Sequence, residues 1–278
     1  MGGEVLIGKV SLPCTGGFFC SPPVLARRFS RRSGTGLSFA KGLRRQFRPT
    51  VAFSSTAALP VVHNLAYRLA LLAGVGGLVP WASTGESATL SQAEHVEVVE
   101  AVVDAVEDVP VIAGTGSNNT IEALDLSQQA ADAGADALLL ISPYYNKPEP
   151  EGMYNHYAEI ADTVDLPQII YNVPSRTGRN IAVDTAVDLA DHPNIAGYKA
   201  ASGDLNRISE VIERTRDTEF AVLPGDDGLT LPILAAGGDG AIHLLPNVPP
   251  DLACSLRDHA SARPHALALP HHHALAPR

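Results

Sequence analysis

The chain has 278 residues, of which 45% are hydrophobic, and its formal net charge at pH 7 is −10. This size and apolar content suit one large α/β domain or two small ones, and the acidic balance argues against nucleic acid as a partner. No apolar run reaches transmembrane length without a break, and the three cysteines form neither a metal-ligand spacing nor an even disulfide framework, so we expect a soluble, cytoplasmic protein with no membrane partner.

The start of the chain differs in composition from the rest. Residues 1–75 hold ten Lys or Arg side chains and a single acid, Glu4, whereas residues 76–278 hold ten bases and 29 acids. An Arg- and Ser-rich, acid-poor start is typical of a transit peptide, which would place the protein in an organelle. The same composition fits sequence that was not selected for this fold, such as a shifted reading frame or a fusion, and it fits a disordered arm. We predict a separate basic segment over residues 1–48.

Strand and helix signals alternate from residue 76 onwards. Short apolar runs predict strands at residues 77–81, 111–113, 137–141, 168–171, 195–199, 220–223 and 241–245. Apolar residues at helical spacing predict helices at residues 91–108, 119–133, 151–163, 182–191, 205–216 and 229–236. Strands that are apolar throughout and alternate with helices predict a parallel sheet that helices cover.

Seven β/α units favour a (β/α)8 TIM barrel. Such a barrel has eight strands, so one strand is missing from those predicted above. Residues 50–53 are the best candidate for the first strand, and residues 61–74 for its helix. Polar and ionisable residues follow the predicted strands, where such a barrel builds its active site. A doubly wound sheet usually needs a phosphate loop, and Gly114-Thr115-Gly116 is too short for a dinucleotide fingerprint. We therefore predict an α/β barrel over residues 49–248.

The last segment, residues 249–278, breaks this pattern and is rich in Ala, His and Pro. The run His271-His272-His273 could bind a metal weakly, but nothing in the sequence fixes a coordination geometry. We predict an unstructured tail and no metal site.

A lysine, Lys199, ends the apolar strand predicted at residues 195–199, and the preceding predicted strand ends in Tyr171. Burying an ammonium group without a partner is costly. A lysine held in that setting has a lowered pKa and becomes a nucleophilic amine, which a Schiff-base enzyme requires. The alternative is a lysine whose ammonium group reaches solvent at the strand end.

Five short motifs favour the first interpretation. They are Ser83-Thr84-Gly85-Glu86-Ser87, Gly114-Thr115-Gly116, Pro143-Tyr144-Tyr145-Asn146, the Tyr-Asn-Val-Pro-Ser-Arg-Thr-Gly sequence at 171–178, and Gly197-Tyr198-Lys199-Ala200. In order and spacing they resemble the dihydrodipicolinate synthase / N-acetylneuraminate lyase family over residues 75–248. The resemblance implies a (β/α)8 barrel that needs no cofactor and forms an imine between Lys199 and pyruvate. Against that family, the first β/α unit is atypical and the C-terminal helical region is truncated.

The resemblance and the chemistry together assign further catalytic residues. Tyr171 would transfer protons, and because a free phenol with a pKa of ~10 is a poor base, it needs a hydroxyl relay. Ser83 and Tyr145 would supply that relay, with Tyr145 reaching in from a neighbouring subunit. Backbone amides near Ser83 and Thr84 would hold the pyruvate carboxylate, since a strand-to-helix turn exposes free N–H groups. We therefore expect a homo-oligomer, either a dimer or a tetramer.

Substrate choice depends on Arg176. A guanidinium clamps a carboxylate through two hydrogen bonds, and the synthases of the family use an Arg here to hold aspartate semialdehyde. The resemblance places the Ile242 carbonyl and Gly225 at the substrate site as well. We expect a lyase that condenses pyruvate with L-aspartate 4-semialdehyde to 4-hydroxy-tetrahydrodipicolinate, in lysine and diaminopimelate biosynthesis. The alternatives are an aldolase for sialic acid or a 2-keto-3-deoxy sugar acid, and an inactive, truncated relic.

The resemblance also indicates a regulatory site. Lysine-inhibited relatives bind lysine at a subunit interface through residues equivalent to Asn118, Glu122, Tyr144 and His95, and all four are present. Another histidine of that site is replaced by Gln92. The alternative is that these are ordinary surface side chains, because Glu and Asn are common on helices.

Overall fold

The structure is a computed structural model, and it describes residues 50–54, 75–85, 87–106 and 109–243, all within the same compact unit of the chain. The side chains of residues 50–54, 84 and 243 are not described. The predicted helix at 61–74, the basic segment at 1–48 and the tail at 249–278 lie outside the described residues. The domain boundaries at 49 and 248 do too, and they stay predictions.

The described residues form eight strands, all paired in parallel. They are β1 (Thr50–Ser54), β2 (Gly77–Val79), β3 (Ile112–Gly114), β4 (Ala137–Ile141), β5 (Gln168–Asn172), β6 (Ile195–Ala200), β7 (Ala221–Pro224) and β8 (Gly240–His243). One sheet has the order β2-β1-β8 and the other runs from β3 to β7 in sequence order. The predicted strand at 50–53 is therefore confirmed as β1, which pairs with both β2 and β8.

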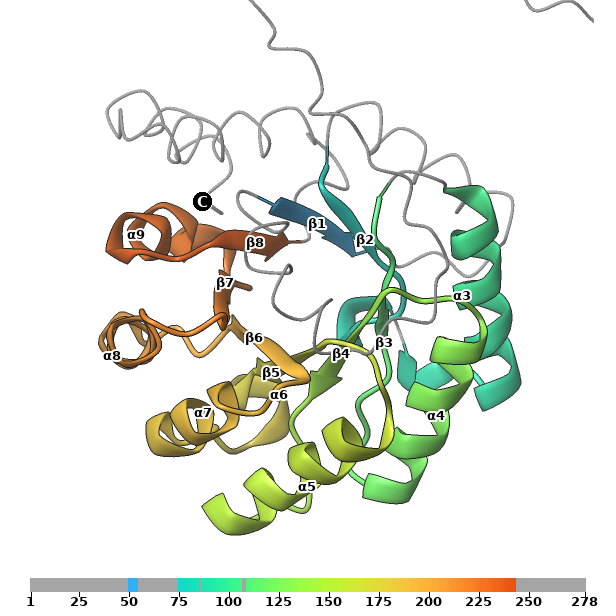
Figure 1. The fold of residues 1–278 in the computed structure, drawn as a ribbon, viewed down its shortest axis with the longest axis horizontal. Helices are drawn as coiled ribbons and strands as arrows, with labels where there is room; N and C mark the ends of the chain where they lie inside the picture. The colour runs from blue at the N-terminus through green and yellow to red at the C-terminus, as the bar shows by residue number, and fades with distance from the viewer. Residues whose placement is uncertain (1–49, 55–74, 86, 107–108, 244–278) are drawn as a thin grey trace, which may run out of the picture. The chain divides into compact units, whose positions relative to one another are not determined.

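Two local links join these sheets. Leu78 and Val111 form an isolated parallel bridge between β2 and the start of β3. Asp239, directly before β8, donates its backbone N–H to the carbonyl of Val222 on β7, and its carboxylate accepts the N–H of Val222. The strand order therefore closes on itself, with helices around the outside of the ring (Figure 1). The predicted (β/α)8 barrel is confirmed.

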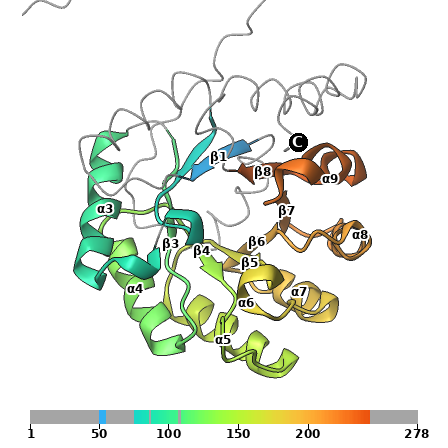
Figure 2. The same cartoon turned by 180° about the vertical axis from the view of Figure 1, so that it is seen from behind.

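Helices follow the strands and lie around the ring in both views (Figures 1 and 2). The α-helices are α3 (Gln92–Ala105), α4 (Thr120–Asp132), α5 (Pro150–Thr163), α6 (Pro174–Thr177), α7 (Val183–Ala190), α8 (Leu205–Arg214) and α9 (Thr230–Ala236). Short 3-10 helices are η1 (Ser83–Gly85), η2 (Ser87–Thr89) and η3 (Asp227–Leu229). The capping box at the start of α3 is formed between Ser91 and Glu94. The single turn α6 was not predicted from the sequence.

Alternation along the strands separates two apolar layers. On β4, Leu138 and Leu140 pack in a cluster with the helices, whereas Leu139 belongs to a second cluster inside the ring. On β5, Tyr171 belongs to the inner cluster. On β6, Tyr198 and Ala200 belong to the outer cluster. The residue between them, Lys199, therefore faces the inside of the ring.

Within the described ranges, no helix has both the length and the apolar content needed to cross a membrane.

Candidate active site

Lys199 is buried beside Tyr171. The two residues pair in register at the ends of β6 and β5. The lysine is only 5% exposed, and its Nζ lies 4.2 Å from the centre of the Tyr171 ring. A cation over the face of an aromatic ring is attracted by the ring quadrupole. The amine therefore points inward against the tyrosine, and the alternative in which it reaches solvent is wrong.

Burial changes the charge state of this amine. Desolvation lowers the pKa of Lys199 to about 7, the nearby Asp227 carboxylate raises it and the Arg176 guanidinium lowers it. At pH 7 roughly half of the molecules therefore carry a neutral amine, compared with fewer than about one in a thousand for an exposed lysine. A neutral, sheltered amine of this kind can add to a carbonyl carbon. Asp227 was not predicted as a site residue, although an acid in the Gly225-Asp226-Asp227 run that follows a predicted strand was a signal for it.

Tyr171 is buried too, and burial raises the pKa of its phenol, while the nearby Ser83 hydroxyl and the Arg176 guanidinium lower it. The phenol therefore stays protonated at neutral pH. Among the described residues, the buried Ser83 Oγ has no hydrogen-bond partner of normal geometry. The serine hydroxyl is thus close enough to influence the phenol and still able to bond a ligand.

Arg176 lies on α6, directly after β5. This turn runs from Pro174 to Thr177 and is capped by Gly178, whose φ of 78° is in the left-handed region that glycine adopts without strain. Arg176 is exposed. The chain following α6 is tied to the β4–α5 loop, because Arg179 donates Nη1 to the Lys147 carbonyl at 3.1 Å and forms an ion pair with Glu149.

Three other predicted site residues lie in separate parts of the ring. Gly225 follows β7, and a Cβ there would come within 2.9 Å of the Lys199 Cε atom, so glycine leaves room for the lysine side chain. Ile242 is buried on β8 in the inner apolar cluster. Thr84 lies in η1, and its side chain is not described.

Tyr145 does not lie beside the buried amine of Lys199 in the same chain. It is 88% exposed, and its φ of 66° is rare for a residue with a Cβ. The neighbouring Asn146 holds this loop by donating its side-chain amide to the Asn118 carbonyl at 2.9 Å. The tyrosine thus projects away from its own chain, on a loop that is tied to the one before it.

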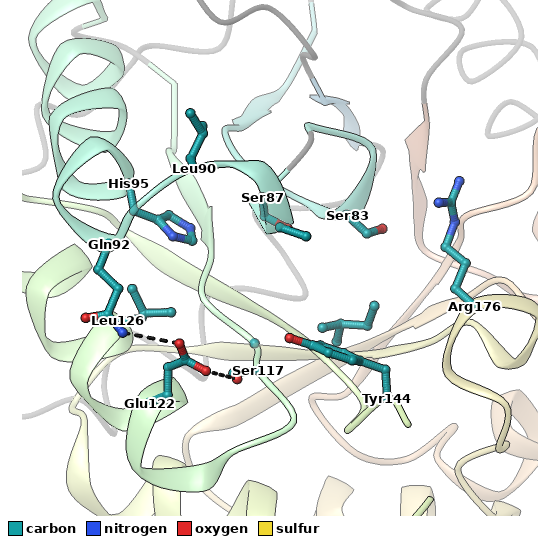
Figure 3. A pocket seen from close by; sticks show the side chains of 13 residues that line it. Ser83, Ser87, Leu90, Gln92, His95, Ser117, Glu122, Leu126, Tyr144 and Arg176 are labelled. Atoms are coloured by element: carbon teal, nitrogen blue, oxygen red, sulfur yellow. Dashed lines mark hydrogen bonds between the residues drawn. The ribbon is translucent and has the colours of Figure 1, made fainter. Parts of the chain in front are cut away.

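A cavity of about 430 Å³ lies next to these residues (Figure 3). Figure 3 shows Ser83 and Arg176 on one side of the cavity and the α3 and α4 side chains on the other. It is lined by Ser83, Ser87, Ala88, Leu90, Gln92, His95, Gly116, Ser117, Glu122, Leu126, Ile141, Tyr144 and Arg176. Neither Lys199 nor Tyr171 is among these residues, so the buried Lys199–Tyr171 pair lies beside the open volume and does not line it.

The far side of the cavity is polar. Glu122 accepts hydrogen bonds from the Gln92 amide at 3.2 Å and from the Ser117 hydroxyl. His95 donates Nε2–H to the Gly114 carbonyl at 3.1 Å, and desolvation lowers its pKa to about 4, partly offset by that hydrogen bond. Of the four residues predicted for a lysine site, the lining includes Glu122, Tyr144 and His95.

The fourth of these residues, Asn118, is absent from the lining. Ser117, which was not predicted as a site residue, lines the cavity instead. Its hydroxyl bonds Glu122, and only the fold shows that both face the cavity. In the described part of the chain, no group of three or more His, Cys, Asp or Glu side chains could hold a metal ion.

Comparisons with known proteins identify close relatives. The chain matches the Dihydrodipicolinate synthetase family over residues 63–277. It is 65% identical over 205 residues to a 4-hydroxy-tetrahydrodipicolinate synthase from Haloarcula marismortui, covering 74% of this chain and 67% of that protein. It is 72% identical over 184 residues to the protein of that name from Natronomonas pharaonis, covering 66% of this chain and 63% of the relative. The chain thus spans about two thirds or less of the length of these curated relatives.

A solved structure has the same fold. It is a chloride-inhibited dihydrodipicolinate synthase from Acinetobacter baumannii complexed with pyruvate, with a TM-score of 0.78 and 37% sequence identity. The superposition covers 81% of this chain and 80% of that one.

Proposed function

Because the chain belongs to the dihydrodipicolinate synthetase family, we propose that it is a Schiff-base-forming lyase that condenses pyruvate with L-aspartate 4-semialdehyde to 4-hydroxy-tetrahydrodipicolinate. The observation that carries the proposal is the buried amine of Lys199 at 4.2 Å from the Tyr171 ring, with a pKa of about 7. The pyruvate complex of the A. baumannii relative supports the choice of the first substrate.

Lys199 acts as the nucleophile. Its neutral amine adds to the pyruvate ketone, and loss of water gives a cationic imine. The imine withdraws electrons from the methyl group, which loses a proton and becomes an enamine carbon nucleophile. That carbon attacks the aldehyde of the second substrate and forms the new carbon–carbon bond. The amino group of the semialdehyde then replaces the lysine amine on the imine carbon, which closes the ring and frees Lys199.

Tyr171 transfers protons in these steps. Its raised pKa keeps it a proton donor at neutral pH, and it needs a second hydroxyl to pass a proton onward. Ser83 is near it, and its buried hydroxyl, which lowers the pKa of the phenol, has no hydrogen-bond partner of normal geometry among the described residues. Tyr145 would add a third hydroxyl from a second copy of the chain. Its 88% exposure supports a homo-oligomer, either a dimer or a tetramer, with shared sites.

Arg176 selects the second substrate. It is exposed, lines the cavity and lies close enough to affect the pKa values of both Lys199 and Tyr171. A guanidinium at this place can clamp the carboxylate of aspartate semialdehyde while the aldehyde meets the enamine. Backbone amides near Ser83 and Thr84 would hold the pyruvate carboxylate. Gly225 and the carbonyl of Ile242 would complete the substrate site.

The polar side of the cavity is proposed to bind lysine as a feedback inhibitor. The carboxylate of Glu122 can pair with an ammonium group, and Tyr144 offers an aromatic face, while Asn118 would contribute from the adjacent loop. The neutral His95 is bonded to the Gly114 carbonyl and shapes the wall. We place the reaction in the cytoplasm, in a catalytic domain over residues 49–248, with no cofactor other than the covalent imine.

The proposal is tested by incubating the protein with pyruvate and sodium borohydride, followed by mass spectrometry of the intact chain and of its peptides. A reduced pyruvyl group on Lys199 is expected. A folded protein that forms no such adduct would contradict the lyase and favour an inactive relic. Turnover of aspartate semialdehyde, compared with sialic acid and with 2-keto-3-deoxy sugar acids, then distinguishes this lyase from other aldolases of the family.

A further inference from the structure

The register between β5 and β6 changes near the start of the two strands. Gln168 pairs with Ile195, but the next residue of β5, Ile169, pairs with Gly197. β6 therefore contains one extra residue here, a β-bulge, which is rare between parallel strands. Beyond the bulge the register is regular, and it places Tyr171 opposite Lys199.

This extra residue decides which way Lys199 points. Ile195 lies in the outer apolar cluster and so does Tyr198, three positions later, an odd spacing that strict alternation does not allow. Without the bulge, Tyr198 would take the inward position opposite Tyr171 and Lys199 would face the helices. A shift of one residue moves every side chain to the other face of a strand.

Glycine is required at the bulge itself. A Cβ on Gly197 would come within 2.8 Å of the carbonyl oxygen of Ala221, its partner on β7. Backbone atoms cannot move aside as a flexible side chain can, so a larger residue would push β6 away from β7 at this point.

A buried hydrogen bond spans the shifted strands on the outer face. The Asn172 amide donates Nδ2–H to the Tyr198 hydroxyl at 2.7 Å, and both side chains are completely buried. Tyr198 pairs in register with Ile170, so this bond reaches diagonally, two residues along β5. It can form only in the shifted register, because a slip of one residue would turn Tyr198 to the inside of the ring.

The side-chain amide of Asn172 makes further hydrogen bonds through both its nitrogen and its oxygen. Asn172 Nδ2 also donates to Asn180 Oδ1 at 3.0 Å, and Asn172 Oδ1 accepts the backbone N–H of Ile181 at 3.0 Å. One amide therefore joins β5, β6 and the chain that follows the Arg176 turn. Buried polar networks in which every group is satisfied specify one arrangement of a core.

We propose that Tyr198 is a positioning residue for Lys199: its hydroxyl, bonded to Asn172, holds the register in which Lys199 stands opposite Tyr171 inside the ring. The catalytic consequence rests on the proposed function, because it requires that Lys199 is the reactive amine. The effect on the position of Lys199 does not depend on that function and can be measured separately.

Tyr157 provides a matched control. It is a second completely buried tyrosine in the same outer cluster, and its hydroxyl donates to the Leu140 carbonyl at 3.4 Å. The change Tyr157→Phe removes the same chemical group from the same core, next to Tyr198, and deletes neither partner of the Asn172–Tyr198 hydrogen bond. A general cost of losing a buried hydroxyl would appear in both variants, whereas a positioning effect would appear only in Tyr198→Phe.

The titration of Lys199 reports its position directly. The chain has four lysines, Lys9, Lys41, Lys147 and Lys199. NMR of protein carrying ¹³C at the lysine Cε atoms therefore gives few signals, and the one missing from Lys199→Ala is assigned to Lys199. The groups acting on this amine are Asp227, Arg176 and the Tyr171 ring. None of them is altered in Tyr198→Phe, so a changed titration reports a changed burial.

We expect the titration midpoint of Lys199 in Tyr198→Phe to rise by about one pH unit from its value of about 7, since a less buried lysine regains part of its normal basicity. The rate of pyruvate trapping at pH 7 should fall several-fold in parallel. KM for aspartate semialdehyde should change less than kcat. Tyr157→Phe should match the parent protein in all three measurements.

Each other outcome has a defined meaning. An unchanged Lys199 titration in folded Tyr198→Phe would overturn the proposal. If that variant does not fold, Gly197→Ala, which disturbs the bulge from the β7 side, must raise the midpoint instead. If both variants fail to fold while Tyr157→Phe folds, Tyr198 has a merely structural role and the proposal is wrong. A parent protein with a low Lys199 midpoint and no pyruvate adduct would contradict only the proposed function.

Discussion

Two regions of the molecule surround their charged side chains differently: the ends of β5 and β6, and the polar side of the cavity. At the strand ends, Lys199 is removed from water and its pKa is low because of burial. Across the cavity, Glu122 is partly exposed and bonded to Gln92 and Ser117. Desolvation makes an amine reactive, whereas a partly exposed carboxylate held by ordinary hydrogen bonds can pair with a cationic ligand. The two regions thus suit chemistry and binding respectively, although Ser83 and Arg176 border the same cavity as Glu122.

The largest expected effect is at the amine. Lys199→Ala should abolish both the borohydride-trapped adduct and turnover, because no other described lysine is buried near Tyr171. Mass spectrometry of the trapped protein and a turnover assay check this. Lys147→Ala is the matched control, since Lys147 is exposed and should leave adduct formation intact. An adduct that persists in Lys199→Ala would place the reactive amine elsewhere.

The second-largest expected effect concerns Arg176, and it should separate the use of aspartate semialdehyde from the capture of pyruvate. Arg176→Ala should lower kcat/KM for aspartate semialdehyde by about 100-fold, since a charge-assisted bidentate clamp on a carboxylate is worth roughly 3 kcal/mol. The rate of pyruvate trapping should change far less. Steady-state kinetics and trapping are measured on the same preparation, with Arg216→Ala as the control, because Arg216 is exposed and forms an ion pair with Glu213. Equal losses in both assays would count against the clamp.

A smaller effect is expected on the polar side of the cavity. Glu122→Gln should weaken lysine binding about tenfold, because the variant keeps the shape but loses the charge that pairs with an ammonium group. Calorimetric titration with lysine checks this. Asp125→Asn changes an exposed acid one turn further along α4 and serves as the control. Equal lysine affinity in the parent and Glu122→Gln would remove the carboxylate from the proposed site.

The smallest effect is a pH dependence. The lowered pKa of Lys199 means that the neutral amine predominates above about pH 7 and the ammonium form below it. The trapping rate should therefore fall roughly fivefold from pH 7 to pH 6 and level off above pH 8. Tyr171, whose pKa is raised, should not titrate in this range. A rate that keeps rising to pH 10 would show that the amine is not desolvated.

Local patterns in the chain were enough to predict the architecture. Apolar strands of three to five residues alternate with helical periods from residue 77 to residue 245, and such repeats build a parallel barrel. The predicted β1 at residues 50–53 and the resemblance to the family are confirmed. The α6 turn was missed because four residues are too few to show a helical period.

The sequence allowed us to predict which residues form the candidate site, but not how their side chains are placed relative to one another. A lysine ending a buried run, five residues long, indicated an unusual environment, and the motifs named its partners. The roles of Lys199, Tyr171 and Arg176 stay predictions until the trapping experiments are done. Ser117 was missed because nothing in its local sequence distinguishes it from an ordinary polar residue after a strand. Asp227 was missed although its position after a predicted strand was a signal, because the sequence does not show that its carboxylate acts on Lys199.

The sequence by itself determined which residues are apolar, where strands and helices alternate, and that one lysine would lie among apolar neighbours. Only the tertiary structure decided which face of β6 that lysine occupies, because one extra residue opposite β5 inverts the alternation. It also decided that Tyr198, which reads as an ordinary core residue, bonds Asn172 on the neighbouring strand. Such pairings depend on strand register across separate segments, and a linear pattern of residue types does not specify register.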